Sequence, residues 1–170
     1  MKKHLALLLV LTLILCGTGC AAQPEQTPEQ SGTPSIAVLP GTDTDLGITL
    51  TLKDITRSGA TVVCTQSGSE SIGELTTGSY FVVERLNKDN NWTEVEQLKL
   101  DGELSWTAIA YLVNKNGTTE WEVNWGWLYG ELPDGHYRIG KQFIHSPEPG
   151  ILDTHILYTE FSFGEMLIPA

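Results

Sequence analysis

The sequence has little positive charge. It contains 10 Lys and Arg residues against 21 Asp and Glu residues, so its formal net charge is −11 at pH 7. Nucleic-acid recognition depends on clustered Lys and Arg side chains that neutralise phosphates. The composition therefore excludes a nucleic-acid partner, and solubility alone explains the acidic surface.

Cysteine is also scarce. The chain has three cysteines, and two of them, Cys16 and Cys20, lie in the N-terminal leader. Cys64 is then alone, which excludes a disulfide framework and a cysteine-based metal site in the rest of the chain. It lies in an apolar stretch, so we expect a small buried hydrophobic residue there.

Long apolar runs are missing except at the N-terminus. Lys2 and Lys3 precede an apolar run over residues 5–15, and small residues follow it up to Cys20. The run is shorter than the ~20 apolar residues that a membrane-spanning helix needs. The three parts together are typical of a secretory signal, which we place at residues 1–20.

Cys20 resembles the cysteine of a bacterial lipobox, which is acylated and becomes the new N-terminus. Gly19 fits that motif, whereas Gly17 stands where the motif usually has leucine. The resemblance implies a lipoprotein signal peptide and a palmitate-type anchor on the extracytoplasmic face of the bacterial cell membrane. Membrane contact would be through this lipid only. The alternative is ordinary cleavage after Ala22, which would release a secreted protein.

Residues 21–44 are dominated by Gln, Pro, Glu, Thr, Ser and Gly. Such a segment cannot bury enough apolar surface to offset the entropy lost on ordering, so we expect a disordered linker. A flexible coil of this length spans ~25–30 Å on average. The linker would hold the following domain away from the membrane.

From Leu46 onward the pattern is that of β-structure. Leu46, Ile48, Leu50 and Leu52 alternate with other residues, which is the period of a half-buried strand. The strands that we expect cover residues 46–53, 60–66, 80–87, 92–98, 106–113, 118–125, 137–143 and 154–163. A short turn near 126–131 is the best helical candidate. Strands at this spacing predict an all-β, antiparallel sandwich of seven to eight strands over residues 45–165.

Two stretches carry a family resemblance. The first is GITLTLKDIT at 47–56 with GAT at 59–61, and the second is GTTEW at 117–121 running through WLYGELPDGHYRI at 127–139. They resemble the bacterial immunoglobulin-like domain of Gram-positive surface lipoproteins. The resemblance implies an Ig-like sandwich over residues 45–165 that binds or displays and is not an enzyme.

The segment that ends at Ile139 resembles a tyrosine corner, in which the hydroxyl of Tyr137 would bond to the backbone just upstream. Antibody domains have the second disulfide cysteine at the place of Ile139, and Cys64 would occupy the place of the first. The resemblance therefore implies that Cys64 and Ile139 pin the core without a disulfide.

Five aromatic or apolar residues, Trp121, Val123, Trp125, Trp127 and Tyr129, share one parity. On a strand they would all face the same way. One interpretation is a core-facing strand whose aromatic rings fill the sandwich. The other is an exposed platform for a glycan or peptide. Trp127 and Tyr129 lie beyond the expected end of the strand and are the candidate ligand platform.

Catalytic and metal-binding patterns are lacking. No Gly-x-Ser-x-Gly elbow and no Gly-rich phosphate loop occurs, so we expect no catalytic residue and no cofactor. His136, His145 and His155 have irregular spacing, and we interpret them as ordinary strand or loop residues rather than metal ligands.

We therefore expect a surface-anchored Ig-like binding or display module without catalytic activity. Its partner would be an unknown protein or a cell-wall polymer. The alternative is a carbohydrate-binding or enzyme-accessory lipoprotein that uses its exposed aromatic residues.

Overall fold

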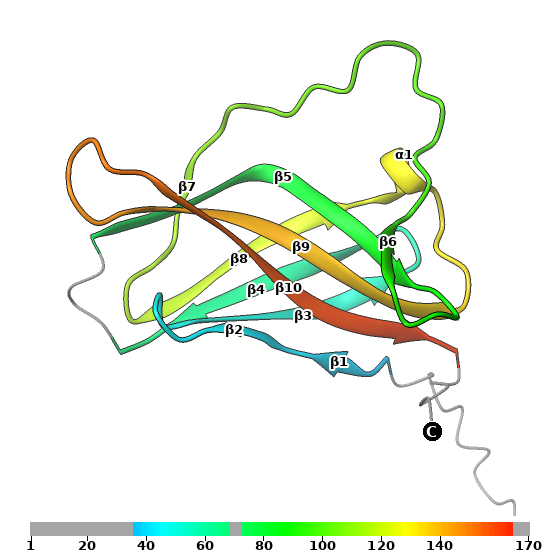
Figure 1. The fold of residues 1–170 in the computed structure, drawn as a ribbon, viewed down its shortest axis with the longest axis horizontal. Coiled ribbons are helices and arrows are strands. Elements are labelled where there is room, and N and C mark those ends of the chain that lie inside the picture. The colour runs from blue at the N-terminus through cyan, green and yellow to red at the C-terminus, as the bar shows by residue number, and fades with distance from the viewer. Residues whose placement is uncertain (1–35, 69–72, 165–170) are drawn as a thin grey trace, which may run out of the picture. The chain divides into compact units, whose positions relative to one another are not determined.

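Ten strands and one short helix make up residues 36–68 and 73–164, the part of the chain that the computed structural model describes (Figure 1). In chain order they are β1 (Val38–Leu39), β2 (Gly41–Asp43), β3 (Ile48–Thr56), β4 (Gly59–Gln66), β5 (Glu74–Leu86), β6 (Trp92–Glu94), β7 (Tyr111–Leu112), β8 (Gly117–Asn124), α1 (Gly126–Tyr129), β9 (Gly135–Ser146) and β10 (Asp153–Phe163). The predicted signal peptide with Cys20, and the predicted linker up to residue 35, lie outside the described residues. Within them, no helix is long and apolar enough to cross a bilayer.

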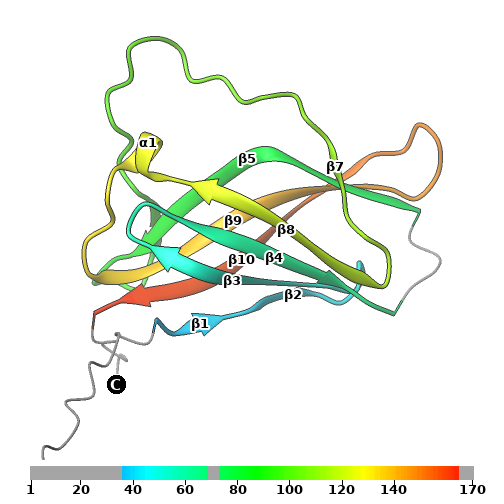
Figure 2. The ribbon, with the colours of Figure 1, turned by 180° about the vertical axis from the view of Figure 1, so that it is seen from behind.

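The strands form two antiparallel sheets that pack face to face (Figures 1 and 2). One sheet has the order β1-β10-β9-β5-β6, with β7 also paired to β5, and the other has the order β2-β3-β4-β8. Strand β8 therefore forms an edge of its sheet. The predicted all-β antiparallel sandwich is confirmed, although the described residues form ten strands instead of the expected seven to eight.

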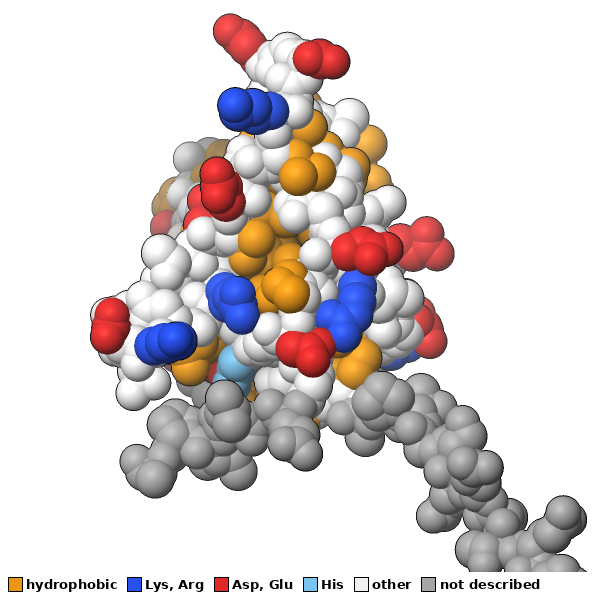
Figure 3. All heavy atoms as spheres, turned by 90° about the vertical axis from the view of Figure 1, so that its right-hand side faces the viewer, with side chains coloured by type: hydrophobic (Ala, Val, Ile, Leu, Met, Phe, Trp, Pro, Cys, Tyr) orange, Lys and Arg blue, Asp and Glu red, His pale blue; other side chains and the backbone are white. Residues whose placement is uncertain are grey.

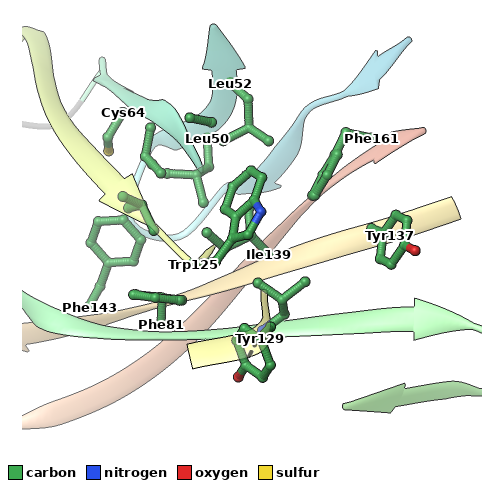
Figure 4. Packing of buried hydrophobic residues seen from close by; sticks show 14 of the residues in the cluster. Leu50, Leu52, Cys64, Phe81, Trp125, Tyr129, Tyr137, Ile139, Phe143 and Phe161 are labelled. Carbon is green, nitrogen blue, oxygen red and sulfur yellow. Dashed lines mark hydrogen bonds between the residues drawn. The ribbon is translucent and has the colours of Figure 1, made fainter. Parts of the chain in front are cut away.

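The core lies between the sheets and follows the period-two pattern of the strands. Ile48 and Leu50 of β3 are almost completely buried, as are Tyr137 and Ile139 of the facing β9. Figure 4 shows Trp125 in the middle of this cluster, with side chains of both sheets around it. Apolar side chains also reach the surface, and Figure 3 shows them in a band between acidic and basic ones.

The chain between β6 and β7 differs from the prediction. The expected strands 92–98 and 106–113 shrink to β6 and β7, and residues 95–110 form a long loop that arches over one flank of the sandwich (Figures 1 and 2). The ladder between β5 and β9 is irregular between Thr77 and Phe81. Strands β6 and β7 pair with β5 on opposite sides of this bulge. The bulge thus prevents residues 92–113 from pairing continuously with β5.

The predicted linker also extends too far toward the C-terminus. Residues 38–43 form β1 and β2, where Val38 pairs with Phe161 and Gly41 pairs with Leu50. The carbonyl of Leu39 also accepts a hydrogen bond from the hydroxyl of Thr159 at 3.0 Å. These residues are ordered by backbone pairing to both sheets. Amino-acid composition reflects side-chain hydrophobicity and therefore did not predict this backbone pairing.

Candidate functional site

An aromatic groove of about 520 Å³ opens along one flank of the sandwich. Elements β5, β8, α1 and β9 and the loop 95–110 all contribute to it. We define the aromatic groove by the five aromatic residues in its lining, Phe81, Trp106, Tyr111, Trp121 and Trp127. Concave sites of this size with aromatic walls and a few polar groups are typical of ligand binding.

The groove follows the edge of β8. Four consecutive residues of that strand, 121–124, line it. Successive side chains of a strand point to opposite faces, so consecutive residues can share a groove only where it meets the strand's edge. On the opposite side the loop runs beside the β5 bulge, because the hydroxyl of Ser79 donates to the carbonyl of Thr107 at 2.8 Å. The groove thus separates the edges of the two sheets.

Trp106 anchors the loop and forms one wall. Its ring packs edge-to-face on Phe81 at 5.0 Å and on Tyr80 at 5.3 Å between ring centroids. It also contacts Trp127 at 5.7 Å between ring centroids, and 42% of Trp127 is exposed. The pair presents a firmly held aromatic surface at the mouth of the groove.

Lys141 lies in the floor of the groove. It belongs to the inward-facing series of β9 that includes Tyr137, Ile139 and Phe143, and only 2% of it is exposed. An ammonium group at a core position is unusual because its desolvation is costly.

The ammonium of Lys141 is held by the β5 bulge. Its Nζ donates to the carbonyl of Gly78 and, at 3.1 Å, to the carbonyl of Tyr80. Among the described residues it forms no ion pair with a carboxylate. Burial lowers the pKa of Lys141 to about 8, so the side chain still carries most of its charge at pH 7.

The tyrosine corner predicted from the sequence is present. Tyr137 is fully buried and its hydroxyl donates to the carbonyl of Pro133 at 3.0 Å. Cys64 and Ile139 are also fully buried, and they lie in one core cluster on strands of the two facing sheets. Cys64 is a free thiol, and its burial raises its pKa to about 12.

The family profile of a bacterial Ig-like domain matches residues 44–162. The chain belongs to the bacterial Ig-like domain family. No curated protein and no solved structure matches it. Membership of this family favours a non-catalytic role in binding or display.

The structure contradicts the expected exposure of Tyr129, one of the two residues of the predicted ligand platform. Trp127 is exposed, but Tyr129 is only 6% exposed. The hydroxyl of Tyr129 donates to the Glu94 carboxylate at 2.9 Å and accepts from the Val83 amide at 3.4 Å, and burial raises its pKa. The strand ends at Asn124 and α1 follows, so the side-chain period changes and Tyr129 turns inward.

The tryptophan-rich stretch is buried at some positions and reaches the surface at others. Val123 and Trp125 are buried in the core of the Ig-like domain. Trp125 stacks on Phe161 at 5.3 Å, and its Nε1 donates to the carbonyl of Arg57 at 2.8 Å. Trp121 is half-buried and lines the groove. Core and groove are therefore built from adjacent residues of the same stretch.

The histidines of the Ig-like domain lie in separate polar contacts. His136 lies 2.8 Å from the Glu160 carboxylate, and His155 lies 3.3 Å from that of Asp43. The rings of His145 and His155 are 6.4 Å apart. No group of three or more possible metal ligands occurs among the residues that the structure describes.

Sequence reasoning missed Lys141 and Trp106. A signal for Lys141 was present, because it shares the parity of Tyr137, Ile139 and Phe143 on one strand. A lysine on the apolar side of a strand indicates a buried charge, which is often functional. Trp106 gave no such signal, since its place in the groove depends on the course of a long loop.

Proposed function

We propose that this chain is a surface-anchored, non-catalytic Ig-like module that binds its partner in the aromatic groove. The observation that carries the proposal is the exposed Trp127 ring beside a concave, partly polar lining. Exposed aromatic side chains in a pre-formed groove supply binding energy without a conformational change. The family to which the chain belongs favours the same role.

A carbohydrate of the cell wall is the favoured partner class. Ser79, Ser105, Thr107 and Asn124 line the groove between its aromatic rings. A sugar ring offers an apolar C–H face to an aromatic ring and hydroxyl groups to such polar side chains. A purely apolar partner would displace water from these polar side chains without replacing the hydrogen bonds to that water, which costs affinity.

Replacement of Trp127 by alanine tests the groove. The mature chain is mixed with purified cell-wall sacculi, and the bound fraction is measured by cosedimentation. We expect Trp127→Ala to weaken binding about tenfold, as at an aromatic hot spot worth about 1.4 kcal/mol.

Trp92→Ala is the matched control, because Trp92 lies on β6 under the Arg138 guanidinium and does not line the groove. We expect this variant to sediment like the wild type. Equal binding by Trp127→Ala would contradict a role for the groove, and no sedimentation of the wild type would contradict a cell-wall partner.

The proposed anchor is tested separately through Cys20. Cells that express the full chain are grown with an alkyne-tagged palmitate, and labelled protein is detected on a gel. We expect label on the wild type and on Cys16→Ser, and none on Cys20→Ser, because only Cys20 follows the small residues of the leader. Label that survives in Cys20→Ser would place the lipid on another residue and rule out this anchor, whereas a wild type without label would leave plain secretion.

A further inference from the structure

We propose that the aromatic groove selects a sugar that carries a carboxylate, and that Lys141 in its floor is the partner of that carboxylate. This inference rests on the proposed function and specifies the chemistry of the ligand.

The charge of Lys141 has no counterion in the described structure. Its Nζ donates to two carbonyls, those of Gly78 and Tyr80, while an ammonium has three N–H donors. Carbonyl dipoles offset part of the desolvation cost, but a buried charge is normally retained together with an opposite charge. Because Lys141 lines the groove, a bound anion would reach it and supply that charge.

The groove is suited to a single negative charge. Among the described residues, Lys141 is the only Lys or Arg that lines the groove. Sites for phosphate usually gather several donors or an Arg fork. Glu122 also lines the groove and is exposed. Its carboxylate would repel a densely charged polyanion, so one carboxylate on an otherwise neutral ligand is the best match.

The neutral part of the ligand is inferred from the rim. Ser79, Thr107 and Asn124, with hydroxyl and amide groups, line the same groove as the exposed Trp127. A pyranose ring satisfies both kinds of surface, whereas the apolar side chains of a peptide would satisfy only the aromatic one. The groove therefore fits a carboxylated sugar better than an acidic peptide, and the experiment below distinguishes the two.

The test compares matched probes by titration calorimetry with the mature chain. The probes are N-acetylmuramic acid, its methyl ester, and N-acetyl-aspartate amide as a source of a peptide carboxylate. We expect the acid to bind about tenfold more tightly than the ester, because one charge-assisted hydrogen bond is lost on esterification. Lys141→Gln, which keeps an amide donor for the two carbonyls, is expected to bind acid and ester alike.

Glu122→Gln keeps the test decisive if Lys141→Gln fails to fold. Removal of this exposed carboxylate is expected to tighten binding of the acid about twofold and to leave the ester unchanged. Equal affinity of the wild type for acid and ester overturns the proposal, as does a retained preference in Lys141→Gln. Binding of the aspartate probe alone overturns the sugar. If no probe binds while sacculi still sediment the chain through Trp127, this inference fails and the proposed function stands.

Discussion

Trp125→Ala is expected to lower the free energy of unfolding by about 5 kcal/mol. Large-to-small changes of buried aromatic residues cost about 3–5 kcal/mol. Here the carbonyl of Arg57 also loses one of its two donors, the Trp125 Nε1, and keeps the amide of Leu132. The ring is fully buried and stacks on Phe161. Domains of this size have about 5–15 kcal/mol of stability in total, so the variant should be close to unfolding at 25 °C. Urea denaturation followed by far-ultraviolet circular dichroism measures the loss.

Trp127→Ala is the matched control for Trp125→Ala, because the two tryptophans are two residues apart and differ in burial. With 42% of Trp127 exposed, we expect its truncation to cost about 1 kcal/mol, chiefly through its contact with Trp106. Similar losses for the two variants would contradict the placement of Trp125 at the centre of the core.

Tyr137→Ala is expected to cost about 4 kcal/mol, and Tyr137→Phe about 1 kcal/mol. The larger loss comes from the buried ring, which stacks on Phe161 at 5.7 Å. The smaller loss isolates the hydroxyl, which donates to the carbonyl of Pro133 and would leave that carbonyl without its donor. Urea midpoints of the wild type and both variants measure the two contributions.

Tyr111→Phe provides the comparison for the hydroxyl, because Tyr111 is 40% exposed. Its hydroxyl is expected to contribute less than about 0.5 kcal/mol, as is usual for a surface substitution. If Tyr137→Phe unfolds at the same urea concentration as the wild type, the corner hydrogen bond does not stabilise the domain.

The strand pattern could be predicted where one face of a strand is buried. Ile48 and Leu50 of β3 alternate with polar neighbours, and the strand forms nearly where expected. The same reasoning fails for residues 95–98 and 106–110, which were expected in strands but lack a continuous edge with which to pair. Whether such a segment forms a strand depends on pairing partners that are far apart in the sequence. Local periodicity carries no information about these partners.

The candidate site could be predicted only in part. The exposure of Trp127 follows from its place beyond the strand, whereas the single turn of α1 points Tyr129 inward five residues after the strand's end. The floor of the groove depends on the bulge in β5, which frees two carbonyls for Lys141. A bulge is a consequence of three-dimensional pairing and leaves no reliable mark in a single sequence.

The short strands β1 and β2 have a mechanical consequence for a chain held by its N-terminus. Strand β1 pairs with β10 of one sheet, and β2, one residue later, pairs with β3 of the other. In the anchored form that we propose, tension on the tether would reach β1 first. The two-residue β1 can detach from β10 first, and β2 can detach from β3 next. Strand β3 would stay in place because its side chains form part of the core. Strands β1 and β2 would thus detach one after the other under tension. The chain would lengthen while the groove keeps its shape.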